Sequence, residues 1–409
     1  MKIYSFLNGL AILSLFVSSS VATSDGEEYE EWSLWKNENG KVYLQSEEEL
    51  ERLSIWKSNK LYIEEHNRYS ELFGFTLKMN QFSDMTSYEF LKITTSSGAS
   101  IGGPEHDDDD KGKDDDKGKD DGDKGKDDDK GKDDDKGKDD DKGKDDDKGK
   151  DDDNKDDDSH DHDSDSKEAD SPHVWSTIGG YFSLPQHFNI TKLPETVDWR
   201  DEGVVTPVKD QGFCNSAYAF TVTGAIEGAY AVSTGVLEPL SDQNIVDCSV
   251  VYGNKGCKGG DREAALMYIL DNDGIDKEKA YPYIASQDTC RFRVDEIGAV
   301  VRGMVKIKKG NVSNLQAAVA LVGPVTTSID HQHNAFRFYS SGIFTTRKCS
   351  NKKMTHEMLI VGYGKENGKS YWLLKNSWGP NWGISGYMKM AKRNRNHCGI
   401  ATRAIFPKL

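Results

Sequence analysis

The segment that decides the fold is Gln211-Gly212-Phe213-Cys214-Asn215-Ser216-Ala217-Tyr218-Ala219-Phe220. A helix is expected to begin near Cys214, because Phe220, Ile226 and Tyr230 lie at helical spacing and would share one buried side. The segment therefore predicts the entry to a buried helix.

This segment resembles the catalytic motif of papain-like cysteine proteases, Gln-Gly-x-Cys-Gly-Ser-Cys-Trp-Ala-Phe. The nucleophilic Cys of that motif corresponds to Ala217, its second Gly to Asn215 and its Trp to Tyr218. A thiolate is the nucleophile in this chemistry, and a methyl group cannot replace it. Three departures within four residues indicate natural divergence rather than a single engineered change. The resemblance thus predicts a homologue that is proteolytically inactive.

The resemblance assigns the other catalytic roles to residues spread over the rest of the chain. Gln211 matches the oxyanion-binding Gln, His356 the general acid and base, and Asn376 the residue that orients it, with Trp378 as a shield. Without a thiolate, His356 and Asn376 are expected to remain as structural residues that bond each other. An alternative makes Ser216 the nucleophile, but one helical step turns a side chain by about 100°, away from His356.

The substrate-binding positions implied by the resemblance are charged where the family has apolar side chains. The family sequence Cys-Asn-Gly-Gly corresponds to Cys257-Lys258-Gly259-Gly260, which could still bond an extended peptide. The expected substrate-binding residues are Gly259, Gly260, Asp261, Arg262, Ser328, Glu357, Arg403 and Trp378. A plainer alternative is that Asp261 and Arg262 pair with each other and face solvent.

The six cysteines form an even set, which suggests complete pairing in an oxidising compartment. The sequence alone leaves the connectivity open. The resemblance implies the pairs Cys214–Cys257, Cys248–Cys290 and Cys349–Cys398. No cysteine is then left as a free nucleophile, which agrees with Ala217. We expect no cofactor and no metal at the site.

The first residues predict a secretory signal. Lys2 precedes an apolar run from Leu10 to Val17, and Ser20-Val21-Ala22 offers small residues for cleavage. The run is too short to span a bilayer, and no later segment is long enough. Residues 1–22 are therefore expected to be a signal peptide, and the protein to be secreted or lysosomal without a membrane partner.

Residues 23–104 resemble the inhibitory propeptide of the same family. One helical face is predicted by residues that recur at steps of three and four, namely Glu48, Arg52, Trp56, Asn59, Ile63 and Asn67. A second motif is Asn80-x-Phe82-x-Asp84. The resemblance implies that this domain caps the cleft and that its own following segment occupies it.

Residues 105–170 form a repeat of Asp, Lys and Gly. The formal net charge of the chain is -17, yet the acidic residues are concentrated here, whereas residues 193–409 hold more basic than acidic residues. With Ala169 as its one apolar residue, the repeat is expected to be a disordered spacer, and residues 171–192 a linker. Weak Ca²⁺ or mineral binding by its carboxylates is the alternative. His160 and His162 could bind a transition metal, but solvated histidines are favoured.

Residues 193–409 are expected to be the mature domain. Strands are predicted at Val325 to Ile329, Leu359 to Tyr363, Ser370 to Lys375 and Gly386 to Met390. The predicted fold is α+β and papain-like, with a helical left lobe, a β-barrel-like right lobe and a cleft between them.

The function expected from these residues is binding without proteolysis. The expected partners are a peptide or an inhibitor-like protein, or an extracellular matrix, and no nucleic acid; the protein is expected to be a monomer. Two alternatives stay open: an acidic, Ca²⁺- or mineral-associated structural protein, and a residual hydrolase.

Overall fold

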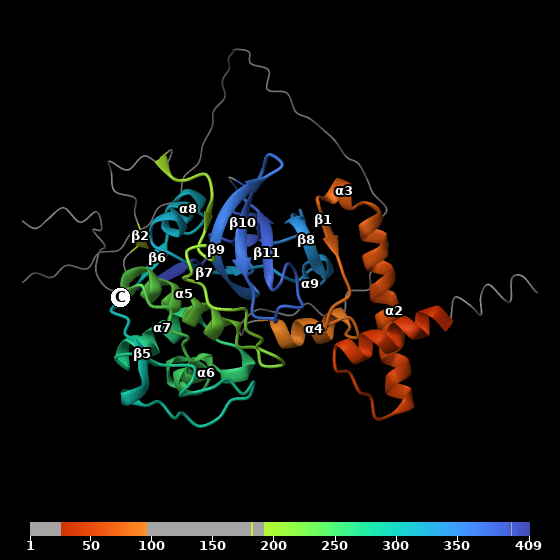
Figure 1. The fold of residues 1–409 in the computed structure, drawn as a ribbon, viewed down its shortest axis with the longest axis horizontal. Coiled ribbons are helices and arrows are strands. Elements are labelled where there is room, and N and C mark those ends of the chain that lie inside the picture. Colours follow the sequence, from red (N-terminus) through yellow and green to blue (C-terminus); the bar gives the residue numbers. More distant parts are fainter. Residues whose placement is uncertain (1–25, 96–180, 183–191, 394) are drawn as a thin grey trace, which may run out of the picture. The chain divides into compact units, whose positions relative to one another are not determined.

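The structure, a computed structural model, describes residues 26–95, 181–182, 192–393 and 395–409 (Figure 1). The expected signal peptide, the Asp/Lys/Gly repeat and most of the expected linker lie outside these residues. Across the described residues, every helix is too short or too polar to span a bilayer.

The N-terminal part is mostly helical. A helix over residues 26–38 is followed by α2 (Ser46–Arg68), α3 (Ser70–Phe73), β1 (Phe75–Leu77) and α4 (Ser87–Thr94). The helix α4 begins with a capping box: the Thr86 side chain accepts a hydrogen bond from the Glu89 backbone, and the Glu89 side chain accepts one from the Thr86 backbone.

The predicted face of α2 holds this part together. Trp56 and Ile63 are buried, and Arg52 forms an ion pair with Glu89 at 2.8 Å. Asn59 Nδ2 donates hydrogen bonds to the carbonyls of two residues in the loop before α4. Arg52 and Asn59 therefore fasten α2 to the downstream segment, which is why they share a face with the apolar residues.

The C-terminal part begins with helices and ends in a sheet. Its helices are α5 (Ala217–Thr234), α6 (Asp242–Cys248), α7 (Arg262–Asp271), α8 (Val312–Leu321) and α9 (Asn334–Arg337), with 3-10 turns at Ser249–Tyr252, Gly256–Lys258, Val294–Glu296 and His397–Gly399. Its strands are β2 (Tyr181–Phe182), β3 (Val197–Asp198), β4 (Ile275–Asp276), β5 (Ile297–Ala299), β6 (Gly303–Ile307), β7 (Val325–Ile329), β8 (Tyr339–Phe344), β9 (His356–Glu366), β10 (Lys369–Lys375), β11 (Tyr387–Ala391) and β12 (Ile405–Lys408). The α+β class is confirmed, and β7 has the predicted bounds.

One sheet joins the two parts of the chain. Its strand order is β1-β8-β11-β10-β9-β7-β12-β6-β2, with β3 beside β9. The long hairpin of β9 and β10 turns at Asn367 and Gly368, which have φ of 48° and 77°. Both central residues of such a tight hairpin turn need positive φ, which Asn and Gly tolerate best. β1 adds an N-terminal edge to this sheet by pairing with β8.

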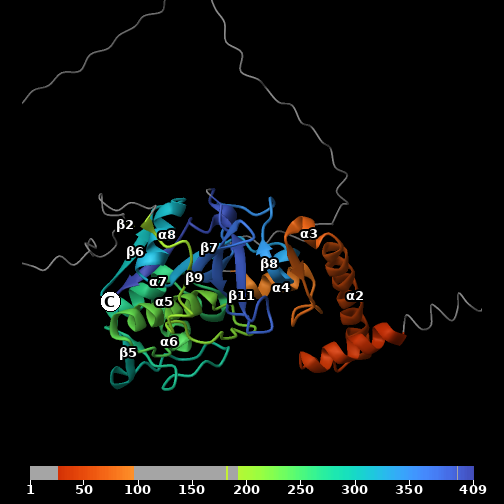
Figure 2. The ribbon, with the colours of Figure 1, turned by 45° about the horizontal axis from the view of Figure 1, so that its top comes forward.

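The helix α5 is more deeply buried than a one-sided helix would be. It lies between the sheet and helices α6 and α7, as both ribbon views show (Figures 1 and 2). Phe220 and Ile226 are buried as predicted, but so is every residue from Ala217 to Gly228, including Glu227. The expectation of a single buried side was therefore wrong for the first three turns, because both lobes pack against them.

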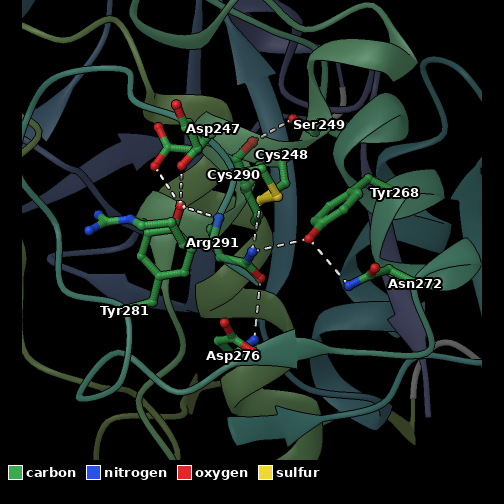
Figure 3. Close-up of a disulfide and its surroundings, with 12 residues drawn as sticks. Asp247, Cys248, Ser249, Tyr268, Asn272, Asp276, Tyr281, Cys290 and Arg291 are labelled. Carbon is green, nitrogen blue, oxygen red and sulfur yellow. Dashed lines mark hydrogen bonds between the residues drawn. A yellow bond between two sulfur atoms is a disulfide. The ribbon is translucent and has the colours of Figure 1, made fainter. Parts of the chain in front are cut away.

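The three disulfides are the pairs that the resemblance implied, Cys214–Cys257, Cys248–Cys290 and Cys349–Cys398. Figure 3 shows the second of them among polar residues of the helical lobe. There the Tyr281 hydroxyl donates to Asp247 Oδ2 at 2.7 Å and accepts from the Arg291 backbone at 3.2 Å (Figure 3). This network ties the loop that carries Cys290 to α6.

Candidate active site under the propeptide

The segment Gln211–Ala217 leads into the N-terminus of α5, and Ala217 is its first helical residue. Gln211 is fully buried. Its Nε2 donates to the Cys214 carbonyl at 2.9 Å, and its Oε1 accepts from Ser377 Oγ at 2.6 Å. The side chain of Gln211 is thus held by bonds inside the protein, with no substrate needed to fix it.

His356 and Asn376 form the hydrogen bond that the sequence predicts. His356 Nε2 lies 2.8 Å from Asn376 Oδ1, and the same oxygen accepts from the Ser377 backbone at 2.9 Å. An amide oxygen only accepts, so His356 Nε2 must carry the proton. In the neutral ring, Nδ1 then holds a lone pair.

Burial lowers the pKa of His356 to about 4, against smaller raising effects from Asn376 and the Thr94 backbone. Trp378 covers the imidazole, with ring centroids 4.6 Å apart. Two phenylalanines of the N-terminal part, Phe82 and Phe90, contact Trp378 edge-on at 5.4 and 5.3 Å. The histidine is therefore neutral near pH 7 and sealed from water by aromatic rings.

Ser216 makes no hydrogen bond with His356 in the described part of the chain. Its Oγ lies 2.7 Å from the Tyr283 hydroxyl and 3.3 Å from the Cys214 carbonyl, and the residue is fully buried. A general base must lie within hydrogen-bond reach of the nucleophile it activates. The position of Ser216 gives no support to a serine hydrolase.

Arg262, expected in the second specificity pocket, is almost completely buried. Its guanidinium donates to Thr326 Oγ1 at 2.8 Å, to Ser328 Oγ at 2.7 Å and to the Arg403 carbonyl. Burial lowers its pKa to about 10, while the charge of Glu357 opposes that shift. The side chain is therefore an internal crosslink between α7 and the strands behind it.

The alternative in which Asp261 and Arg262 pair and face solvent is wrong. Asp261 instead forms its ion pair with Arg403, and it also caps α7 by accepting from the Glu263 backbone at 2.8 Å. The Asp261 carboxylate thus has partners at the surface, and Arg262 has its own in the interior. Because the two residues are adjacent in the sequence, the sequence alone did not indicate that their side chains point to different places.

Gly259 and Gly260 are required by their surroundings. Gly259 has φ of 95°, and a Cβ on Gly260 would lie 2.7 Å from two ring carbons of Tyr218. Tyr218, which stands where the family motif has Trp, donates its hydroxyl to the Gly256 carbonyl at 3.2 Å. The two glycines therefore have a packing role in addition to the peptide-binding role expected of them.

Sequence reasoning missed His331 and underestimated Asn215. His331 is fully buried, with its ring centroid 5.0 Å from that of His356. Asn215 stands where the family motif has Gly; it is buried, and its Nδ2 donates to the Thr95 carbonyl. The only sequence signal for His331 was a second histidine in Asp330-His331-Gln332-His333, which resembles no motif.

Among the described residues, one group could hold a metal by proximity: Cys349, His397 and Cys398. The two sulfurs are joined as a disulfide, so neither is the thiolate that a metal needs. His397 only lies beside the bridge, with Nδ1 3.9 Å from Cys349 Sγ. The group is a disulfide with a neighbouring histidine.

The fold and the site define the chain as a papain-type precursor. Residues 193–408 match the Papain family cysteine protease family, and residues 32–90 match the Cathepsin propeptide inhibitor domain (I29). The chain belongs to the papain family, on its cathepsin L-like side.

Particular relatives cover nearly all of the chain. Silicatein of Petrosia ficiformis is 38% identical, over 93% of this chain and 94% of that protein. Procathepsin L of Mus musculus is 35% identical over 97% of both. Among solved structures, digestive procathepsin L 3 of Tenebrio molitor larval midgut has a TM-score of 0.69 at 32% identity, covering 93% of this chain and 99% of that one.

Proposed function

We propose that this protein is a secreted or lysosomal papain-family homologue that holds an extended peptide in its cleft without cutting it. The observation that carries the proposal is Ala217, which occupies the first turn of α5 where the family motif has its nucleophilic Cys. A helix N-terminus lowers the pKa of a thiol and so favours a thiolate, but the methyl group of Ala217 has no proton to lose. His356 then has no nucleophile to activate.

Two further features support binding rather than catalysis. Gln211, His356 and Asn376 keep hydrogen bonds whose partners lie inside the protein, so they stabilise the fold without substrate. Two residues at the end of α4 already hydrogen-bond this region: the Thr95 carbonyl accepts from Asn215, and the Thr94 hydroxyl bonds His331. An extended peptide in the cleft would present backbone carbonyls in the same way as Thr95 does.

The test is a peptidase assay on the protein before and after removal of the N-terminal part, from acid to neutral pH. We expect no turnover of peptide amides, and no change in size of the pure precursor on incubation in acid. Turnover that disappears in Ser216→Ala or His356→Ala would overturn the proposal. Restored activity in Ala217→Cys would show that the other departures, at Asn215 and Tyr218, are harmless.

A further inference from the structure

The N-terminal part and the mature domain share one core. Phe75, Leu77, Phe82 and Phe90 pack in the same hydrophobic cluster as Trp378 and other residues of the sheet lobe. The strand β1 extends the sheet by pairing with β8. The contact is therefore built like the interior of a single domain, and separating the two parts would expose several large aromatic side chains.

Three buried side chains of the mature domain reach across this contact. Asn215 Nδ2 donates to the Thr95 carbonyl, and the Arg337 guanidinium donates to the carbonyls of Phe82 and Met85. Arg337 is fully buried with no carboxylate in ion-pair range among the described residues, and it lies over the rings of Phe338 and Phe90. In the uncut protein, the hydrogen bonds of the Arg337 guanidinium are therefore made with carbonyls of the propeptide loop.

The third side chain is His331, and its neighbours fix its tautomer. Thr94 Oγ1 donates to the Phe90 carbonyl at 2.8 Å, so it accepts from His331 Nε2, also at 2.8 Å. His331 Nδ1 then accepts from Thr355 Oγ1, again at 2.8 Å. The neutral imidazole joins the end of α4 to the mature domain through a continuous chain of hydrogen bonds.

The propeptide also donates hydrogen bonds to backbone carbonyls of the mature domain. Asn80 Nδ2 donates to the Arg337 carbonyl at 2.8 Å, and Gln81 Nε2 donates to the Trp378 carbonyl at 2.6 Å. The Lys78 backbone donates to the Phe338 carbonyl at 2.9 Å. Polar groups on both sides would lose buried partners on separation, which adds to the apolar cost.

We propose that residues 26–95 remain bound to residues 193–409 as a permanent non-covalent subunit after the chain between them is cut, with Asn215, His331 and Arg337 as anchors. The inference rests on the proposed function, because an inactive protein gains nothing from clearing its cleft. It also names the peptide that the cleft holds: the protein's own residues at the end of α4.

The experiment uses the full chain, cut with enteropeptidase at Asp107–Lys111, whose sequence that protease recognises. We expect the two fragments to elute together in native size-exclusion chromatography at low micromolar concentration and neutral pH, and to separate only in denaturant. Fragments that separate under native conditions would overturn the proposal. The peptidase assay on the same cut sample tests the proposed function independently, because activity and retention are separate readouts.

The anchors are tested by Thr94→Val, with Thr234→Val as the matched control. Both hydroxyls donate to the carbonyl four residues earlier in a helix, but Thr94 also accepts from buried His331, whereas Thr234 is exposed at the end of α5. We expect Thr94→Val to weaken binding between the fragments by about tenfold, and Thr234→Val to leave it unchanged.

Asn215→Gly, which restores the residue of the family motif, tests the second anchor. It should weaken binding about fivefold to tenfold through loss of the bond to the Thr95 carbonyl. If the two fragments bind equally tightly in Thr94→Val and Thr234→Val, His331 is not an anchor. If they bind equally tightly in Asn215→Gly and the unchanged chain, Asn215 is not an anchor. Circular dichroism of each variant before cutting verifies that the fold is intact.

Discussion

The catalytic half of the cleft and its expected specificity pocket have departed from the family pattern in different ways. In the first, Ala217 offers no thiol, while Gln211, His356 and Asn376 keep partners within the protein. In the second, Arg262 turns inward and donates to Thr326 and Ser328 of β7. We infer that polar side chains which hydrogen-bond one another inside the protein need no substrate to stabilise them. Side chains that would otherwise face a bound ligand are stabilised here by the buried guanidinium of Arg262.

The largest effect is expected from Arg262→Met. The variant removes the buried guanidinium that donates to Thr326, Ser328 and the Arg403 carbonyl, and with it a positive charge that Glu357 favours, which costs about 3–5 kcal/mol of unfolding free energy. Urea unfolding of the full chain measures it. Arg302→Met, at an exposed arginine, is the control.

The double variant Arg262→Met with Glu357→Leu should recover only part of that loss, because it removes the buried negative charge but does not restore the lost hydrogen bonds of the guanidinium. A cost below about 1 kcal/mol for Arg262→Met would mean that the guanidinium is not an internal crosslink. The buried guanidinium of Arg262 would then contribute little to stability, and the two regions would not differ in the way described above.

The next effect is a loss of stability in acid. Burial holds the pKa of His356 at about 4 and that of His331 well below its usual range, with His356 and His333 adding to the shift of His331. Between about pH 6.5 and pH 4 the unfolded chain binds protons that the folded chain does not, so stability falls as pH falls. For His356 alone the loss approaches about 3 kcal/mol.

Urea unfolding at a series of pH values measures this dependence. His356→Gln keeps an N–H donor for Asn376 Oδ1 but does not titrate, so its stability should fall less steeply in acid. An identical pH dependence in His356→Gln would show that His356 is not neutral in the folded chain. His356 would then be a buried positive charge, like Arg262.

The sequence predicts which residues surround His356, because they lie in short motifs. Asn376 and Trp378 contact His356, and Gln211 bonds Ser377 beside them. The helix signature of α2 was also informative, because Asn59 binds the loop before α4 and Asn67 binds β1. In such segments the side chain and its role are encoded close together.

The rest of the site depends on contacts between distant segments, which no local pattern reports. His331 meets Thr94 across 237 residues of sequence, and Asp261 meets Arg403 across 142. The order Asp261-Arg262 suggests a pair, yet the two side chains diverge because the first caps α7 and the second enters the core. A sequence can place charges in a pocket, but packing decides which of them is buried.

A smaller effect is expected from Asn376→Ala. The variant removes the acceptor of the buried His356 Nε2–H and of the Ser377 backbone N–H, which costs about 1–3 kcal/mol of unfolding free energy. Urea unfolding at neutral pH measures it, and Asn381→Ala at an exposed asparagine is the control. A neutral result would mean that the pair persists without contributing to stability.

The smallest effect concerns the ion pair of Asp261 and Arg403, which lies partly exposed at the N-terminus of α7. Their side chains are 39% and 46% exposed, so water and salt screen the attraction, and the pair should contribute less than about 1 kcal/mol. Arg403→Gln tests the charge on one side. Asp261→Asn tests the other while keeping an oxygen that can cap α7, whereas Asp261→Ala removes the cap as well.

We therefore expect Arg403→Gln and Asp261→Asn each to change stability by less than about 1 kcal/mol, and Asp261→Ala to cost about 1 kcal/mol more than Asp261→Asn. The coupling energy from the double variant should shrink as salt rises, because the Debye length falls from about 10 Å at 0.1 M to about 3 Å at 1 M. A large coupling that salt leaves unchanged would mean that this pair, too, is shielded from water. The charges of the pocket would then all belong to the interior, and its outer rim would have no exposed ion pair with which to meet a charged ligand.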